Sequence, residues 1–253
     1  MPVALEGGCR VDGLRDGEPS VHGALRIWPR FGRGRGADAI SLRILELADG
    51  TAPELGNPES DEVLYVLEGE GIVSLDGHVE RVSAETGIYL PPGARMRIDN
   101  WGRAPLVLAS ARCPDPGSDG VLPPAPEPAP PGLARQPKPF VRLRDRPREA
   151  TGDRWYSVLV DERLGSRQVT QFVGAIPPGR APDHHHEYEE VLVILAGRGR
   201  LWAGATSADI AAGSCVYLPR AQRHCVENTG QGELRLLGVF YPAGSPGVRY
   251  ESR

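Results

Sequence analysis

Short apolar runs separated by turn residues recur along the chain. Residues 63–67 are followed by Gly69, residues 88–90 by a Pro-Pro-Gly turn, and residues 234–241 by Pro242. Runs of this length that are rich in Val, Ile, Leu and Tyr are typical of β-strands rather than helices. Many short antiparallel strands in a unit of about 110 residues predict an all-β fold, a jelly-roll sandwich or barrel, whose closure also protects the sheet edges.

The pattern occurs twice, with a constant offset of 128 residues. Glu-Val-Leu at 62–64 recurs at 190–192, and Tyr-Leu-Pro at 89–91 recurs at 217–219. Asn100 returns as Asn228. A single offset that holds over such a long stretch is typical of an internal repeat. The sequence therefore predicts two copies of one fold.

A proline-rich segment separates the copies. Residues 114–139 contain ten prolines, which cannot donate ladder hydrogen bonds and favour an extended, semi-rigid chain. The sequence therefore predicts an N-terminal barrel over residues 1–113, a linker over 114–139 and a C-terminal barrel over 140–253.

Composition narrows the classes of partner and compartment. Charged residues make up 25% of the chain and the net charge is −4. Without a basic stripe, nucleic acid and anionic membranes are poor candidates for binding partners. No apolar run approaches the ~20 residues that span a bilayer, and residues 1–12 lack the pattern of a secretion signal. The four cysteines form no C-x-x-C pair, which indicates a reducing, cytoplasmic location.

The candidate chemistry lies in residues 184–190, which read His-His-His-Glu-Tyr-Glu-Glu. Side chains alternate faces along a strand, so His184, His186 and Glu190 can point into one interior. His224 follows a turn at residues 219–221, from which a returning strand can present it to the same point. Three imidazoles and one carboxylate suit iron, manganese, nickel, cobalt, copper or zinc. The sequence predicts one divalent transition-metal ion per chain, bound by these four residues.

A solvated cluster of histidines and glutamates is the main alternative to a metal site. It would account for Glu187 and Glu189, but not for the spacing of the four predicted ligands. His185 has the opposite parity along a strand and is predicted not to be a ligand. Glu189 is likewise predicted to be a neighbour of the site rather than a ligand.

The four predicted ligands resemble the two sequence motifs of the cupin superfamily. Its first motif, G-x5-H-x-H-x3,4-E-x6-G, resembles Gly179, His184, His186, Glu190 and Gly197, with one residue missing after the first glycine. Its second motif, G-x5-P-x-G-x2-H-x3-N, resembles Gly213, Pro219, His224 and Asn228, with Ala221 in place of the central glycine. By this resemblance the chain is identified as a bicupin, with two tandem jelly-roll β-barrels.

The N-terminal copy keeps the strand pattern but loses the ligands. By the 128-residue offset, the three histidine positions correspond to Gly56, Pro58 and Met96, and only Glu62 matches a ligand. A lone carboxylate does not hold a transition metal. This barrel is therefore predicted to be a structural or dimerising partner, with a small-ligand role for its apolar interior as the alternative.

The resemblance leaves the reaction open, because cupins include dioxygenases, decarboxylases, isomerases, epimerases, hydrolases and binding proteins. Members with three histidines and one glutamate include oxygenases and decarboxylases. This implies iron or manganese as the metal, a small-molecule substrate, and Glu190 as a ligand that also accepts a proton. The first hypothesis is a mononuclear metal-dependent oxygenase. Because cupin barrels commonly pair through an outer sheet face, the resemblance also implies a homodimer.

Two alternatives remain open at the level of sequence. One is a redox-neutral hydrolase or isomerase similar to ureidoglycine aminohydrolase, although that family has Glu and Gln where this chain has His184 and His224. The other is a non-catalytic bicupin that binds metal or a small molecule. Candidates to line the pocket of the second barrel are the strand residues Tyr156, Gln171, Phe172, Trp202, Tyr217 and Phe240.

Overall fold

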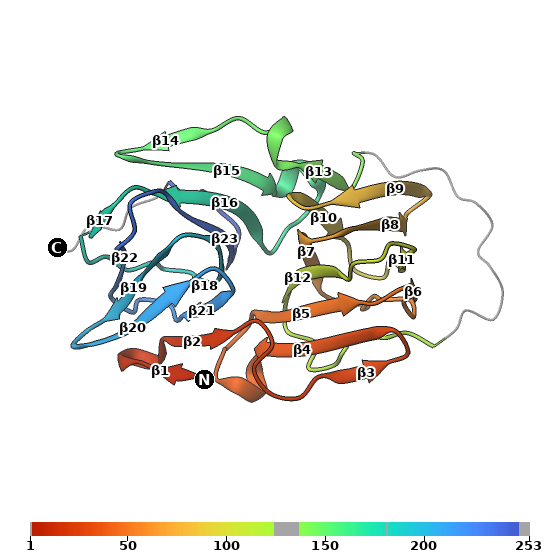
Figure 1. Cartoon of the computed structure of the whole chain (residues 1–253), viewed down its shortest axis with the longest axis horizontal. Coiled ribbons are helices and arrows are strands. Elements are labelled where there is room, and N and C mark those ends of the chain that lie inside the picture. Colours follow the sequence, from red (N-terminus) through yellow and green to blue (C-terminus); the bar gives the residue numbers. More distant parts are fainter. Residues whose placement is uncertain (1, 124–136, 181, 248–253) are drawn as a thin grey trace.

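The computed structural model describes residues 2–123, 137–180 and 182–247. In these ranges the chain consists of antiparallel strands and four short 3-10 helices, η1 (Glu6–Gly8), η2 (Arg33–Arg35), η3 (Leu143–Asp145) and η4 (Glu162–Leu164). The strands form two barrels that lie side by side (Figure 1). The predicted all-β fold with two tandem jelly-roll barrels is confirmed. No described helix is long and apolar enough to cross a membrane.

The first barrel is built from two sheets. The larger sheet has the strand order β13 (Phe140–Arg142), β10 (Thr86–Leu90), β7 (Asp61–Glu68), β12 (Leu106–Cys113), β5 (Ser41–Leu47), β4 (Leu25–Phe31) and β3 (Ser20–His22). The smaller sheet has the order β6 (Gly50–Thr51), β11 (Met96–Asn100), β8 (Glu70–Leu75) and β9 (His78–Ser83).

The second barrel repeats this plan. Its larger sheet has the order β1 (Val3–Ala4), β2 (Arg10–Gly13), β21 (Ser214–Leu218), β18 (Glu189–Ala196), β23 (Leu234–Tyr241), β16 (Thr170–Ile176), β15 (Arg154–Val160) and β14 (Glu149–Thr151). Its smaller sheet has the order β17 (Gly179–Arg180), β22 (His224–Asn228), β19 (Arg198–Ala203) and β20 (Thr206–Ala211).

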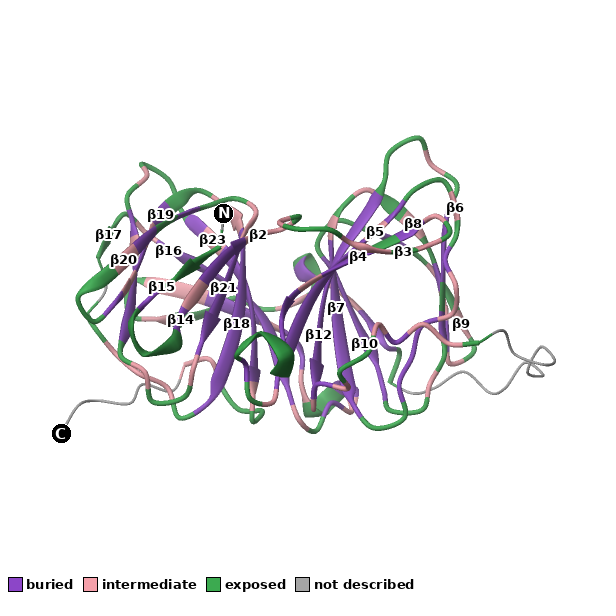
Figure 2. Cartoon of the chain, turned by 90° about the horizontal axis from the view of Figure 1, so that it is seen from below, coloured by how far each residue is buried: buried purple, intermediate pink, exposed green. Residues whose placement is uncertain are grey.

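The larger sheets are buried on both faces. Along β7, Val63 and Tyr65 pack in a core between the barrels, whereas Leu64 and Val66 pack inside the first barrel. Strand β18 alternates in the same way between the shared core and the interior of the second barrel. Figure 2 shows these strands as continuous buried ribbons where the barrels meet. Burial on both faces explains why these strands read in sequence as uninterrupted apolar runs.

Strand exchange departs from the boundaries predicted from sequence. β2, near the N-terminus, pairs with β21 of the second barrel, and β13, beyond the proline-rich segment, pairs with β10 of the first barrel. Figure 1 shows β1 and β2 beside the strands of the second barrel. The predicted division at residues 113 and 140 therefore does not follow the sheets. Backbone hydrogen bonds across a ladder decide barrel membership here, and sequence order does not reveal them.

The described part of the predicted linker lies along the first barrel. The backbone N–H of Asp115 donates to the carbonyl of Ala39 over 2.7 Å, and that of Leu122 donates to the carbonyl of Glu54 over 2.8 Å. Residues 114–123 are thus fixed to this barrel by backbone hydrogen bonds. The remaining stretch of the predicted linker, residues 124–136, lies outside the described residues.

Two equivalent acidic residues join the barrels. Glu189 of the second barrel accepts hydrogen bonds from the backbone N–H groups of residues 38, 39 and 40 of the first barrel and from the Tyr217 hydroxyl, at 2.7–3.2 Å. At the repeat-related position, Asp61 accepts from the backbone N–H groups of residues 167 and 168 and from the Tyr89 hydroxyl, at 2.7–2.8 Å. The barrels are therefore related by an approximate twofold arrangement of the same contacts.

Candidate metal centre

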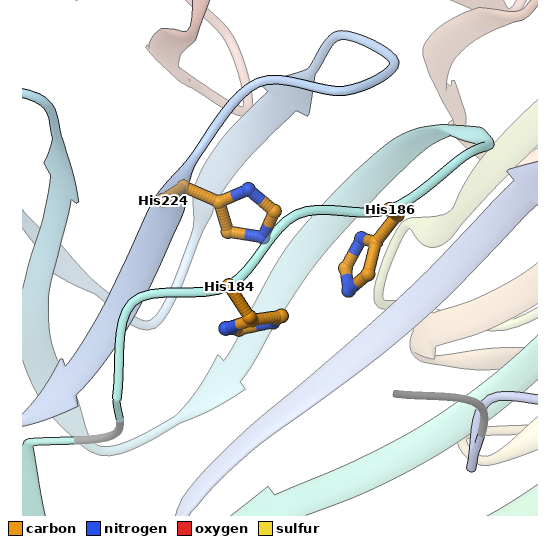
Figure 3. Close-up of side chains that lie close together, drawn as sticks. All are labelled: His184, His186 and His224. Atoms are coloured by element: carbon orange, nitrogen blue, oxygen red, sulfur yellow. The ribbon is translucent and has the colours of Figure 1, made fainter. Parts of the chain in front are cut away.

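Three imidazole rings converge inside the second barrel. His184 and His186 lie on the segment that leads into β18, and His224 begins β22. One ring nitrogen of each lies within 4.8 Å of the other two (Figure 3). The structure therefore brings together the three histidines that the sequence predicted as ligands.

Backbone hydrogen bonds fix the two chain segments that carry the rings. His184 and His224 exchange both backbone hydrogen bonds, at 3.0 and 2.8 Å. The N–H of Ala221 donates to the carbonyl of His186 over 2.7 Å. Ala221 has a positive φ of 58°, a conformation that costs a non-glycine residue about 1 kcal/mol. This cost explains why the family motif has glycine at this turn.

The strand-parity argument from sequence was only partly right. Regular strand β18 begins at Glu189, so residues 184–188 form an irregular segment and the directions of His184 and His186 are set by the bonds to the facing segment. His185 nevertheless lies outside the group of three, with its Nε2 3.5 Å from the Glu187 carboxylate. Glu189 faces the first barrel, as described above, where backbone N–H groups engage its carboxylate.

Backbone acceptors orient two of the rings. The Nδ1 of His184 lies 3.2 Å from the carbonyl of Pro182, and the Nδ1 of His224 lies 2.9 Å from that of Gln222. Since a carbonyl accepts only, these contacts place the proton of each neutral ring on Nδ1 and leave the Nε2 lone pair for a metal. The Nδ1 of His186 is buried and has no hydrogen-bond partner.

Glu190 lies beside the three histidines rather than within the tightest group. Its side chain is 5% exposed, and its carboxylate is 3.4 Å from the Nδ1 of His186. Ligand bonds of ~2.1 Å around one ion separate neighbouring donor atoms by about 3.0–3.4 Å. The separation between these two atoms therefore suits a shared ion, while the carboxylate stands farther from the other two rings.

Burial keeps the His184 and His224 imidazoles neutral. Burial and the neighbouring rings of His186 and His184 lower the pKa of His224 to about 3. Burial and His186 also lower the pKa of His184. Only a neutral imidazole binds a metal, so two of the three rings are held in the binding form at neutral pH.

The metal-free protein should lose stability as the pH falls from 6.5 toward 3. The unfolded chain binds a proton on His224 near the ordinary pKa of 6.5, whereas the folded chain does not until about pH 3. Because the unfolded state binds more protons in this window, acid favours unfolding, by roughly 3 kcal/mol between pH 6.5 and 4. Urea unfolding in a chelator measures the slope. The pH dependence of the unfolding free energy should be weaker in His224→Gln and unchanged in His185→Gln. An unchanged pH dependence in His224→Gln would show that His224 does not cause the loss of stability in acid.

A cavity of about 130 Å³ adjoins the histidines. Its walls are mainly aromatic and aliphatic, and Arg154 and Glu190 are its only residues with a full charge in the described chain. Tyr188 stacks between His186 and Phe240, with ring centroids 4.4 and 4.2 Å apart. The lining residues are Thr151, Arg154, Trp155, Tyr156, Phe172, Gly174, Ala175, Ile176, His184, His186, Tyr188, Glu190, Leu192, Leu218, His224, Val226, Leu236 and Pro246.

Only two of the six residues predicted to line the pocket do so, namely Tyr156 and Phe172. Gln171 and Tyr217 face the first barrel, and the Tyr217 hydroxyl donates to Glu189 of its own barrel at this interface. Trp202 and Phe240 are not among the lining residues. Sequence reasoning missed Arg154 and Tyr188. Arg154 stands two residues before Tyr156 on the same strand, so strand alternation could have indicated that it also lines the pocket.

The ligand positions of the first barrel are shifted by one residue from those predicted. Leu55 forms the backbone bridge with Met96 that His184 forms with His224, and the carbonyl of Asn57 accepts from Gly93 as that of His186 accepts from Ala221. The structural equivalents of the first two histidines are therefore Leu55 and Asn57, not Gly56 and Pro58. The extra residue lies in the irregular segment before Glu62, where a constant offset does not hold.

Arginines surround Glu62 in the first barrel. Its carboxylate accepts from Arg43 Nη2 over 2.7 Å and from the Ser110 hydroxyl over 2.6 Å, with both charged side chains almost fully buried. Burial alone would raise the pKa of Glu62, but Arg43 and Arg112 outweigh it and lower that pKa. By strand pairing, Arg43 and Arg112 occupy the places of Phe172 and Phe240 in the second barrel.

Comparisons with known proteins agree with this architecture. The Cupin domain family matches residues 44–111 and 172–240. Auxin-binding protein 1 of Arabidopsis thaliana is 32% identical over 86 residues, which cover 30% of this chain and 43% of that protein. Tetracenomycin polyketide synthase protein TcmJ of Streptomyces glaucescens is 35% identical over 71 residues, covering 28% of this chain and 48% of that protein. The chain thus spans less than half the length of either relative.

Solved structures extend the likeness to nearly the whole chain. Oxalate decarboxylase of Bacillus subtilis, in a structure at pH 4.6, superposes with a TM-score of 0.73 and covers 93% of this chain and 77% of its own. A mutant of the same enzyme gives a TM-score of 0.71 and covers 91% of this chain and 76% of its own. The sequence identity is 16% in both cases, so the likeness shows a shared two-barrel fold.

Proposed function

Since the chain belongs to the cupin family, with one Cupin domain match in each half, we propose that it is a mononuclear metal-dependent enzyme, with oxygenase chemistry on a small organic molecule. The metal is one divalent transition-metal ion held by His184, His186, His224 and Glu190. The observation that carries the proposal is the meeting of three imidazoles and a buried carboxylate at a cavity with largely apolar walls.

The donor set fits such an ion. Two of the rings have their Nδ1 atoms engaged by backbone carbonyls, and the buried Nδ1 of His186 has no hydrogen-bond partner. Metal-binding histidines are commonly oriented by such contacts to backbone carbonyls. Nitrogen and carboxylate donors suit iron, manganese, nickel, cobalt, copper or zinc, and the likeness to cupin enzymes favours iron or manganese among them. When bound, the metal supplies Lewis acidity and, if it is iron, manganese or copper, the capacity for electron transfer.

The residues around the centre have separate roles. Glu190 is the candidate proton acceptor, because its carboxylate is buried at the cavity and touches only His186 among the three rings. The aliphatic and aromatic walls exclude water, which strengthens electrostatic interactions inside the site. These four protein ligands would leave room on such an ion for a small substrate and dioxygen. A three-ligand set without Glu190 would leave more positions and no carboxylate on the ion.

The relatives bear on the choice of metal. The solved structures with this fold include one that concerns the Mn(II) centres of the Bacillus subtilis oxalate decarboxylase. This supports manganese beside iron as the metal of the present chain. It also makes decarboxylation a redox-neutral alternative to oxygen consumption, within the same ligand set.

Metal content and oxygen uptake test the proposal. Protein purified without added metal is analysed for its elements, and is then reconstituted with Fe(II), Mn(II) or Zn(II) and assayed with a panel of small organic acids and phenols in an oxygen electrode. We expect about one metal per chain, since Leu55, Asn57 and Met96 replace the histidines in the first barrel. Oxygen uptake with iron or manganese but not zinc is expected for an oxygenase. Equal turnover with zinc would rule out the oxygenase and indicate a redox-neutral enzyme. Absence of bound metal would overturn the whole proposal.

A further inference from the structure

We propose that Tyr188 is a positioning residue, whose ring fixes the plane of the His186 imidazole and so directs it toward the metal. This inference rests on the proposed function, because it concerns one of the proposed metal ligands. It is drawn from the different surroundings of the three imidazoles, from a column of aromatic side chains behind His186, and from the loss of this column in the first barrel.

His186 lacks the contact that orients the other two rings. The Nδ1 atoms of His184 and His224 lie 3.2 and 2.9 Å from backbone carbonyls, and such contacts fix the orientation of a metal-binding imidazole. The Nδ1 of His186 is buried without a hydrogen-bond partner. The Glu190 carboxylate, 3.4 Å away, is itself a proposed ligand. The orientation of the His186 ring therefore depends on other contacts.

The Tyr188 ring supplies such a contact. It lies nearly parallel to the His186 ring, with centroids 4.4 Å apart and an angle of 18° between the planes. The χ2 torsion of histidine is soft, but an imidazole cannot turn about it without leaving the face of a parallel ring at this distance. The other two imidazoles meet His186 at steep angles of 62° and 71°. The stack on Tyr188 therefore restricts the torsion that hydrogen bonding leaves free.

Tyr188 is held in turn by the aromatic residues behind it. Its ring stacks on Phe240, with centroids 4.2 Å apart and an angle of 25°. Phe240 contacts Phe172 at 5.9 Å. Gly238 makes room for the Phe172 ring, because a Cβ at this position would collide with it. Strands β16 and β23 thus fix the far end of the column, and a close-packed core of this kind deforms little.

The first barrel lacks both the column and the histidines. By strand pairing, Arg43 and Arg112 stand where the second barrel has the two phenylalanines of the column. Leu55, Asn57 and Met96 stand where it has its three histidines. Since the first barrel folds without the column, the barrel architecture does not require it. Its presence beside the histidine cluster is what we expect of residues that serve the ligands.

Two substitutions of Tyr188 separate its ring from its volume. Tyr188→Phe keeps the aromatic face, and Tyr188→Leu replaces it with a flexible aliphatic side chain. The full chain is loaded with Co(II), whose visible absorption reports the geometry of its ligands, and the affinity is measured by competition with a chelator. Tyr188→Leu should weaken Co(II) binding about tenfold or more, as the loss of other groups that orient a metal ligand does, and should change the spectrum. Tyr188→Phe should match the unchanged chain in both.

Tyr156→Leu is the matched control. Tyr156 is 8% exposed, against 7% for Tyr188, and lines the same cavity. Its hydroxyl donates to Glu149, and the described ring contacts of the three clustered imidazoles do not include it. The substitution should therefore lower the thermal stability of the protein but leave the affinity for Co(II) and the spectrum unchanged.

Phe240→Leu tests the column from its far side. The Phe240 ring stacks on Tyr188, so its loss should change the Co(II) spectrum in the same direction as Tyr188→Leu. This variant also keeps the proposal testable if Tyr188→Leu does not fold. A spectrum that stays the same in both Tyr188→Leu and Phe240→Leu would overturn the proposal.

Two further outcomes would overturn the role of the Tyr188 ring. An equal loss of Co(II) affinity in Tyr156→Leu would show that Tyr188 acts only through packing. A loss in Tyr188→Phe as large as that in Tyr188→Leu would assign the effect to the hydroxyl group.

Failure of the proposed function gives a different result. If the unchanged chain binds no Co(II), the proposed function fails, and the stack is tested by NMR of the metal-free chain. The ring current of Tyr188 shifts the ring-proton resonances of His186 upfield, and these resonances are assigned by their absence in His186→Gln. They should move downfield in Tyr188→Leu and stay in place in Tyr156→Leu. Resonances that do not move in Tyr188→Leu would overturn the positioning role.

Discussion

Replacing His224 with alanine should leave the purified protein with less than about a tenth of the metal that the unchanged chain binds, because each histidine is proposed as a direct donor in a small set. His184→Ala and His186→Ala should have the same effect. One nitrogen of each ring lies within 4.8 Å of the other two, so the loss of any ring removes a potential donor that the described surroundings do not replace. Elemental analysis of the variants measures the metal content.

Glu190→Gln should behave differently from the histidine variants. An amide oxygen coordinates weakly, so appreciable metal should remain, but the negative charge and the capacity to accept a proton are lost. Activity should fall by about 100-fold or more, in line with general-base contributions. His185→Ala is the internal control and should keep both metal and activity, since its ring contacts Glu187 outside the cluster. Metal loss in His185→Ala with metal retained in His184→Ala would show that the ligand assignment is wrong.

Replacing Arg43 with methionine should destabilise the protein by about 3–5 kcal/mol, because removing one partner of a buried ion pair leaves the other charge without its donated hydrogen bond and only partly compensated. Arg43 and Glu62 are 2% and 0% exposed and lie 2.7 Å apart. Arg112 is also close to Glu62, but its Nε and Nη1 atoms have no hydrogen-bond partner. Arg112 therefore does not replace the bond that Arg43 donates.

Urea unfolding in the presence of a chelator measures this loss without a contribution from bound metal. Arg81→Met is the matched control. Arg81 also forms an ion pair, with Glu70 at 2.9 Å, but the two side chains are 74% and 56% exposed. Exposed pairs contribute about 0–1 kcal/mol. A loss in Arg43→Met that is no larger than that in Arg81→Met would contradict the role assigned to the buried pair.

The fold and the histidine cluster were predictable because their signals are local. The turn residues that end each strand stand beside it in sequence, and the histidine pair and the later histidine keep motif spacing. Ala221 at the motif glycine did not hide the pattern, because the turn tolerates its positive φ at a small cost. Glu189 and Glu190 begin a regular strand in which side chains alternate, so their opposite directions follow from the sequence.

Other features depend on contacts that sequence does not record. Leu55 and Asn57 were missed because the extra residue lies in an irregular segment, where a repeat offset gives no register. Arg43 sits in a strand that has the pattern of a buried apolar run, and only tertiary structure shows that its charge meets Glu62 inside the barrel. The pairing of β2 and β13 with the opposite barrels was missed because the partner of a short strand depends on which sheet edge is free nearby in the fold, and composition does not show this.

The exchanged strand also orders events during synthesis. Gly13 of β2 pairs with Ser214 of β21, so β2, once it has left the ribosome, waits for a partner that is made roughly 200 residues later. At about 5–20 residues per second, this delay is roughly 10–40 s. The first barrel lacks β13 for most of that interval, because Phe140 pairs with Ile88 across the proline-rich segment. The first barrel is therefore incomplete when its own repeat has been translated and gains its last strand only with β13, whereas β1 and β2 can join the second barrel only near the end of synthesis.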